Sequence, residues 1–276
     1  MRSLTAPSMF LSGSFRIACS CWLAGLGLLA LLTATASHAK PVAGNAPLVA
    51  AAANMQTALT ELVPLFEKEG KGRLTLSIGS SANLVRQIQQ GLPAELFLSA
   101  DEDFALRLAD AGLTTDRGAV YATGRIVLAA PINATLKLDA QLTGVKNVLS
   151  RAPDSVQKFA IANPELAPYG KAAVQALQKQ AIWSLLQPKI VMGENIAQTT
   201  QYISAGAASA GITALALVLA PAVTDKVRYV VIDSALHAPI RQRMVLLKTA
   251  GPTARAFYDF LQSPVAKQVL QRYGYE

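Results

Sequence analysis

Residues 48–112 read LVAAAANMQTALTELVPLFEKEGKGRLTLSIGSSANLVRQIQQGLPAELFLSADEDFALRLADAG. Short apolar runs alternate in this stretch with segments whose apolar residues recur every three to four positions. The runs predict strands at 48–53, 73–78 and 95–100, and the spaced segments predict helices that close at Gly70, Gly91 and Gly112. This β-α-β-α-β order is typical of a parallel sheet with helices on both faces.

The same alternation restarts near Arg125. The further expected strands are 126–130, 159–162, 190–192, 210–212, 227–232 and 244–247, and the further expected helices are 169–180, 195–205, 252–261 and 264–272. Two such units predict an α/β fold of two Rossmann-like lobes with a ligand cleft between them. Lobe 1 is predicted to hold residues 40–125 and 235–276, and lobe 2 residues 126–234.

The first forty residues differ from the rest of the chain. Arg2 and Arg16 precede an apolar run at 17–32, no acidic residue occurs, and small residues lead up to Ala39. This pattern predicts a secretory signal peptide at 1–39, and therefore a periplasmic protein. Cleavage after Ala36 and retention as a membrane anchor are alternatives, although the run is short of the ~20 residues that a spanning helix needs.

The chemistry left after residue 39 is restricted. Both cysteines (Cys19 and Cys21) and one of the two histidines lie in the predicted signal peptide, which leaves His237. Thiolate chemistry and disulfides are then excluded, and a zinc site or a nucleophilic triad lacks its usual residues. We therefore expect no enzyme and no cofactor. Loss of two arginines lowers the formal net charge from +8 to +6, which weakens the case for nucleic acid as a partner.

Four loops that follow expected strands are small, polar and neutral. They are residues 51–54, 79–81, 167–170 and 193–196, and each lies where a helix is expected to begin. The start of a helix has unpaired N–H groups and a partial positive charge, which suit an oxyanion. Any one of these loops could instead be an ordinary helix cap, because Asn and Ser are preferred there.

The chain resembles the periplasmic molybdate-binding proteins of ABC importers, which are type II solute-binding proteins, over residues 47–276. The segments that carry the resemblance are 48–55, 79–88, 91–101, 161–170, 193–196, 256–261 and 272–274. The resemblance implies a receptor that captures molybdate or tungstate and delivers it to an inner-membrane permease. It also implies a monomer.

The resemblance implies a set of ligand-binding positions. Asn54 and Ser81 would donate from side chain and backbone, whereas Tyr169 and Ile196 would donate from backbone N–H groups; Ala53, Ser80 and Asn195 would lie behind them. Many relatives have a ligand-binding Tyr at the position of Ala214, and Tyr169 could supply that hydroxyl instead. Sulfate or another tetrahedral oxyanion is the alternative ligand, and an exported enzyme acting on an anionic substrate is a more distant alternative.

Overall fold

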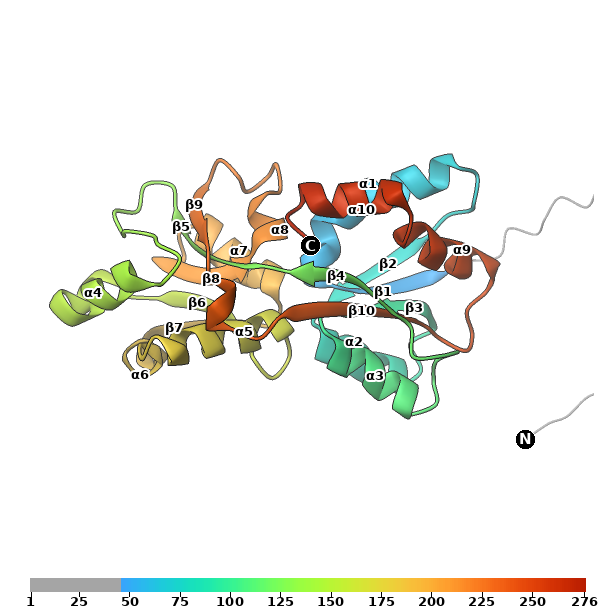
Figure 1. Cartoon of the computed structure of the whole chain (residues 1–276), viewed down its shortest axis with the longest axis horizontal. Coiled ribbons are helices and arrows are strands. Elements are labelled where there is room, and N and C mark those ends of the chain that lie inside the picture. The colour runs from blue at the N-terminus through green and yellow to red at the C-terminus, as the bar shows by residue number, and fades with distance from the viewer. Residues whose placement is uncertain (1–45) are drawn as a thin grey trace, which may run out of the picture. The chain divides into compact units, whose positions relative to one another are not determined.

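A computed structural model describes residues 46–276 (Figure 1). The predicted signal peptide at 1–39 lies outside the described residues. Within them, no helix is long and apolar enough to cross a membrane. The described residues form two five-stranded sheets, each covered by helices.

The first sheet has the order β2-β1-β3-β10-β4. Strands β2, β1 and β3 run parallel, and β10 is antiparallel to both β3 and β4. The strand bounds are β1 (Leu48–Ala52), β2 (Thr75–Gly79), β3 (Ala94–Leu98), β4 (Ala119–Gly124) and β10 (Ile240–Leu246). The associated helices are η1 (Ala53–Met55), α1 (Gln56–Lys68), α2 (Ser81–Gln89), α3 (Glu102–Asp110), α9 (Pro252–Leu261) and α10 (Pro264–Arg272).

Alternation along the central strands places helices on both faces of this sheet. Val49 and Ala51 of β1 pack in one buried cluster with α1, α9 and α10, whereas Ala50 packs in another with α2 and α3. Successive side chains of a strand point to opposite faces, so a strand covered on both sides must be apolar throughout. Figure 1 shows the two helical layers on either side of the strands.

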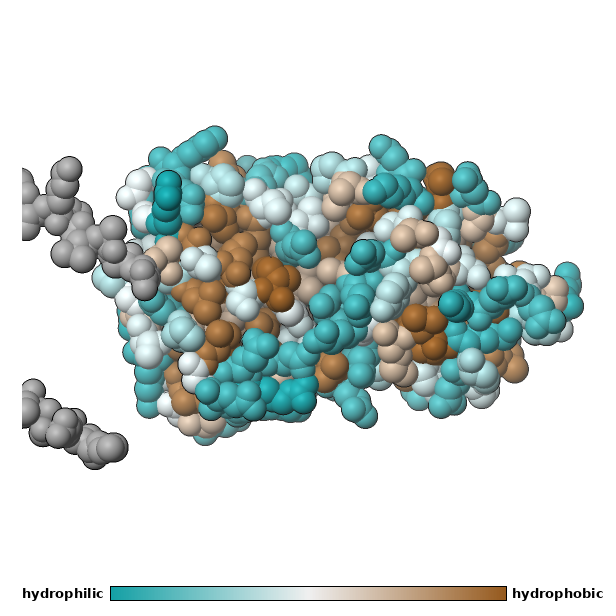
Figure 2. Space-filling view, turned by 180° about the vertical axis from the view of Figure 1, so that it is seen from behind, coloured by the Kyte–Doolittle hydropathy of each residue, from teal (hydrophilic) through white to brown (hydrophobic). Residues whose placement is uncertain are grey.

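The second sheet has the order β7-β6-β8-β5-β9. Its strands are β5 (Ile126–Pro131), β6 (Phe159–Ala162), β7 (Ile190–Gly193), β8 (Ala210–Ala214) and β9 (Val227–Val231). Its helices are α4 (Thr143–Arg151), η2 (Pro153–Ser155), α5 (Pro168–Lys179), α6 (Trp183–Leu186), η3 (Gln187–Lys189), α7 (Ile196–Ser204), α8 (Leu215–Val218) and η4 (Ser234–Leu236). Figure 2 shows the opposite face of the molecule, where hydrophobic residues gather mainly over the lobe of the first sheet.

The two-lobe α/β fold is confirmed, and β1, β2 and β3 are parallel as expected, but each sheet also contains antiparallel pairs. Strand β5 is antiparallel to β8 and β9, as β10 is to its neighbours. The reason is that the chain changes sheet twice, between β4 and β5 and between β9 and β10, and the crossing strands enter against the parallel core. We propose lobe bounds at these two connections, at 125/126 and 234/235.

Candidate functional site

A small cavity lies where the four neutral loops meet. The cavity offers a volume of about 10 Å³ to the centre of a water molecule. Organic ligands fill pockets of about 300–1,000 Å³, so this cavity suits a small ion instead. The lining follows the carboxyl ends of β1, β2, β3, β6 and β7, so it is shared by both sheets. The lining residues are Ala52, Ala53, Asn54, Gly79, Ser80, Ser81, Ala100, Ala167, Pro168, Tyr169, Asn195 and Ile196.

Three helices begin at this cavity. Ser81 is the first residue of α2, Tyr169 the second of α5 after Pro168, and Ile196 the first of α7. Backbone N–H groups in a first helical turn have no partner within the helix, and the helix dipole makes this end partly positive. All three helices thus offer donors toward one space.

Ser81 adds a side-chain donor to this set. Its buried hydroxyl oxygen accepts a hydrogen bond from the backbone N–H of Ala100 at 3.1 Å. The hydroxyl proton remains free to donate, because a hydroxyl accepts and donates at once. The neighbouring Ser80 is also buried, and its Oγ has no hydrogen-bond partner among the described residues.

Asn54 is fully buried at the cavity and held from one side. Its Nδ2 donates to Gln242 Oε1 at 2.8 Å and to Tyr275 Oη at 3.0 Å. Tyr275 Oη in turn donates to the backbone carbonyl of Asn54 at 2.8 Å. The other arm of the amide, Oδ1, has no hydrogen-bond partner within the described residues.

The hydroxyl of Tyr169 is turned toward the strands that connect the lobes. Its Oη accepts a hydrogen bond from Gln242 Nε2 at 2.9 Å, and a Cβ placed on Gly124 would lie 2.1 Å from it. Burial raises the pKa of Tyr169 well above its ordinary value, so the phenol stays neutral. The Tyr169 hydroxyl contacts Gln242, whereas Ala214 is a fully buried residue at the end of β8 that does not line the cavity.

Asn195 acts as a helix cap. Its Oδ1 accepts from the backbone N–H of Gln198 at 3.0 Å, which is the standard N-cap bond for α7. Next to it, the exposed Glu194 accepts from Asn83 Nδ2 at 2.6 Å, and this bond joins α2 of the first lobe to the second lobe.

The lobes are joined over the cavity by further contacts. The backbone N–H of Ala82 donates to the carbonyl of Leu166 at 3.1 Å, and Lys171 lies 3.8 Å from Asp103 across the same gap. These bonds link residues of the two lobes next to the cavity lining, so the described arrangement is a closed one.

Comparison with known proteins identifies the family of this chain. Residues 47–276 match the family described as bacterial extracellular solute-binding protein. The chain belongs to that family. Its members are binding proteins, so this solute-binding protein is not an enzyme.

Molybdate-binding proteins are among its similar relatives. It is 32% identical over 257 residues to the molybdate-binding protein ModA of Rhodobacter capsulatus, covering 91% of this chain and 95% of that protein. It is 33% identical over 230 residues to ModA of Azotobacter vinelandii, covering 82% and 88%. The solved structure of the Azotobacter vinelandii periplasmic molybdate-binding protein superposes with a TM-score of 0.75 at 29% identity, covering 83% of this chain and 98% of that one.

The cavity of this solute-binding protein is lined without charge. None of its lining residues is acidic or basic, and the described part of the chain holds no group of three or more His, Cys, Asp or Glu residues placed to bind a metal cation. A ligand there would be held by oriented dipoles and hydroxyl groups.

Sequence reasoning missed the residues behind the cavity. Gln242, Tyr121 and Tyr275 form one buried hydrogen-bonded group with Asn54 and Tyr169. The one available signal was Gln242 itself, because it shares a strand face with the apolar residues two positions away, Ile240 and Met244.

Proposed function

We propose that this protein captures molybdate in the cavity between its lobes and delivers it to an ABC importer in the inner membrane. The observation that carries the proposal is the uncharged cavity, of single-ion size, at the start of three helices. Relatives named as molybdate-binding proteins cover nearly the whole chain and support the choice of ligand.

Four residues would contact the oxyanion. Asn54 and Ser81 donate through side chain and backbone, and Tyr169 and Ile196 donate through backbone N–H groups. Ala53, Ser80 and Asn195 complete the wall, with Asn195 fixing the first turn of α7. Each hydrogen bond to a charged group contributes about 1.5–3 kcal/mol net, so several convergent donors would hold a dianion tightly.

The lining also favours a fully ionised oxyanion. It contains no carboxylate to accept a hydrogen bond from the protonated oxygen of an anion such as hydrogen phosphate. Tungstate would bind in the same way, because these donors recognise the tetrahedral oxygens rather than the central atom. Sulfate is the competing ligand.

The segment before Lys40 fits a secretory signal peptide, so the working protein would be periplasmic. A monomer is the state that the family resemblance implies. Mass spectrometry of the exported protein is expected to show Lys40 as the first residue. A protein that retains the apolar run at 17–32 would contradict cleavage.

Titration calorimetry tests the proposed ligand directly. Purified protein is titrated with molybdate, tungstate, sulfate and phosphate at the same ionic strength. We expect stoichiometric binding of molybdate and tungstate with weaker binding of sulfate. Stoichiometric phosphate binding without molybdate binding would overturn the proposal.

A further inference from the structure

The free arm of the Asn54 side-chain amide is a hydrogen-bond acceptor, which does not suit an anion. Its two donor hydrogens face Gln242 Oε1 and Tyr275 Oη, and the arm left without a partner is the carbonyl oxygen Oδ1. A carbonyl oxygen repels an oxyanion, and a buried acceptor without a donor destabilises the empty protein.

A half-turn of both buried amides reverses this polarity with little movement of other atoms, because the N and O arms of an amide have nearly the same shape. Gln242 Nε2 would then donate to Asn54 Oδ1 and to Tyr121 Oη, at the positions that Oε1 now occupies. Gln242 Oε1 would accept the hydroxyl proton of Tyr169, whose oxygen now only accepts. Asn54 Nδ2 would become the free arm.

The phenols around Gln242 are compatible with either arrangement. Burial raises the pKa of Tyr121, Tyr169 and Tyr275 above the ordinary value, so all three keep their protons. Tyr121 Oη can donate to the carbonyl of Ser99 at 3.2 Å while it accepts from Gln242. Tyr275 Oη would no longer accept from Asn54, and it would share its one proton between the backbone carbonyl of Asn54 and the rotated Oδ1, which takes the position of Nδ2 at 3.0 Å.

Strand β10 fixes the Gln242 side chain in place. The pairing of β10 with β4 is irregular here, because Gln242 pairs with Ala122 and Arg243 with Val120, so Tyr121 is skipped. Such a bulge changes the direction in which side chains point. Here it accompanies the hydrogen bond from Tyr121 Oη to Gln242 Oε1 at 2.9 Å.

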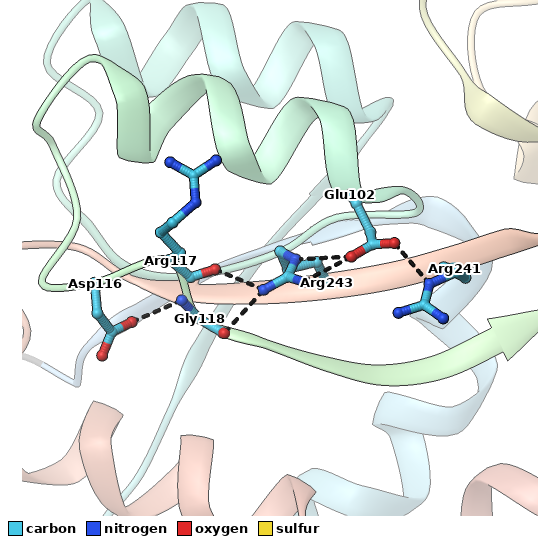
Figure 3. Close-up of polar contacts among 6 residues, drawn as sticks. All are labelled: Glu102, Asp116, Arg117, Gly118, Arg241 and Arg243. Atoms are coloured by element: carbon cyan, nitrogen blue, oxygen red, sulfur yellow. Dashed lines mark hydrogen bonds and ion pairs between the residues drawn. The ribbon is translucent and has the colours of Figure 1, made fainter.

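The residues on either side of Gln242 are held by a carboxylate. Glu102 accepts from Arg241 Nε at 2.7 Å and from Arg243 Nη2 at 2.6 Å, and Arg243 also donates to the backbone carbonyls of Arg117 and Gly118 (Figure 3). Gln242 is fully buried between these two exposed or half-buried arginines. Its backbone is therefore fixed, and the rotation of its amide is the remaining freedom.

We propose that Gln242 is a positioning residue for the oxyanion: its amide rotates together with that of Asn54 and holds Asn54 Nδ2 toward the ligand. The two rotations are coupled, since turning Asn54 alone would set its Oδ1 against Gln242 Oε1. The inference rests on the proposed function and assigns a role to a residue outside the cavity lining.

A double-mutant cycle tests the coupling. Gln242→Met keeps the length of the side chain and removes its amide, and it is combined with Asn54→Ala; Kd for molybdate is measured for all four proteins. Losing an oriented charge-assisted bond corresponds to a Kd about 10-fold higher or more. We expect that rise for Gln242→Met alone and less than about a twofold change in the Asn54→Ala background.

Two outcomes would overturn the inference. One is an unchanged Kd for Gln242→Met in the otherwise native protein; the other is the same rise in both backgrounds, which would indicate a general structural effect. If the native protein binds no molybdate, that result contradicts the proposed function itself, before the double-mutant cycle is measured.

A matched variant and a spectroscopic readout separate positioning from folding. Gln262→Met makes the same exchange at an exposed glutamine at the end of α9, outside the cavity lining, and should leave Kd unchanged. If Gln242→Met does not fold, Tyr169→Phe removes the proton that the rotated Gln242 Oε1 accepts and should raise Kd by a few fold. In nuclear magnetic resonance of the native protein, the Asn54 side-chain amide signals should shift on adding molybdate, and unshifted signals would contradict the rotation.

Discussion

The substitution Ser81→Ala is expected to weaken both ligand binding and folding, because the Ser81 hydroxyl has two roles. Its oxygen accepts from the buried backbone N–H of Ala100 at 3.1 Å, and its proton is proposed to donate to the oxyanion. The substitution removes both bonds and leaves the N–H of Ala100 without a partner. We therefore expect losses in both stability and affinity.

The two losses have different magnitudes. A buried donor left unpaired costs about 1–3 kcal/mol, and each kcal/mol corresponds to about 2–4 °C in the melting temperature of a protein of this size. The lost bond to a charged ligand costs about 1.5–3 kcal/mol, which raises Kd about 10- to 150-fold. At molybdate 1,000 times the native Kd, a 30-fold weaker variant would gain about 2 kcal/mol from the ligand instead of about 4.

Melting of the empty and molybdate-saturated proteins, with titration calorimetry for Kd, measures both effects. The matched control is Ser263→Ala, because Ser263 Oγ also accepts a backbone N–H, that of Ala266 at 3.2 Å, but caps α10 away from the cavity. The control should melt at a lower temperature and bind with native Kd. Equal Kd values for native protein and Ser81→Ala would refute the role of the hydroxyl.

Three further predictions follow from the geometry around the cavity. Gly124→Ala places a methyl group 2.1 Å from Tyr169 Oη, so Kd for molybdate should rise; native Kd in calorimetry would contradict this. Asn83→Ala removes the exposed bond to Glu194 between the lobes, so stopped-flow should show molybdate release up to about 10-fold faster, and unchanged release would argue against a latch. Burial raises the pKa of Asp139, but three hydrogen bonds from backbone N–H groups near the start of α4 together lower it by more. The pKa therefore lies below its ordinary value. This stabilisation is present above the unfolded pKa and lost as pH falls through the folded one. Asp139→Asn should therefore lower the melting temperature at pH 7, and the difference from the native protein should shrink as the pH falls below the ordinary pKa of an aspartate; a constant difference would contradict it.

The parallel strands at the centre of each sheet could be predicted from the sequence, because the pattern that indicates them lies within a few consecutive residues. Residues 48–52 and 159–162 are continuous apolar runs, and such runs indicate strands buried on both faces. Strand β10 was expected only from Met244, but it begins at Ile240. Its polar start, Arg241 to Arg243, is compatible with a strand because Glu102 pairs with both arginines and hydrogen bonds satisfy Gln242.

The candidate site could be predicted only in part, for a similar reason. Loops at the carboxyl ends of parallel strands gather at one edge, so the loops that hold Asn54, Ser81 and Ile196 follow from the strand pattern. The choice of these residues as ligand positions came from the family resemblance. The contacts of Asn54 with Gln242 and Tyr275 join residues separated by 188 and 221 positions in the chain. No local pattern specifies such pairs, because they depend on how the chain returns to the first sheet.

The central claim is that uncharged donors from both lobes hold the oxyanion. Anomalous diffraction at the molybdenum absorption edge, from crystals grown with molybdate, tests it most directly. The account predicts one strong peak in the cavity among Asn54, Ser81, Tyr169 and Ile196. A cavity without a peak, with molybdenum instead beside surface lysine or arginine side chains, would contradict it.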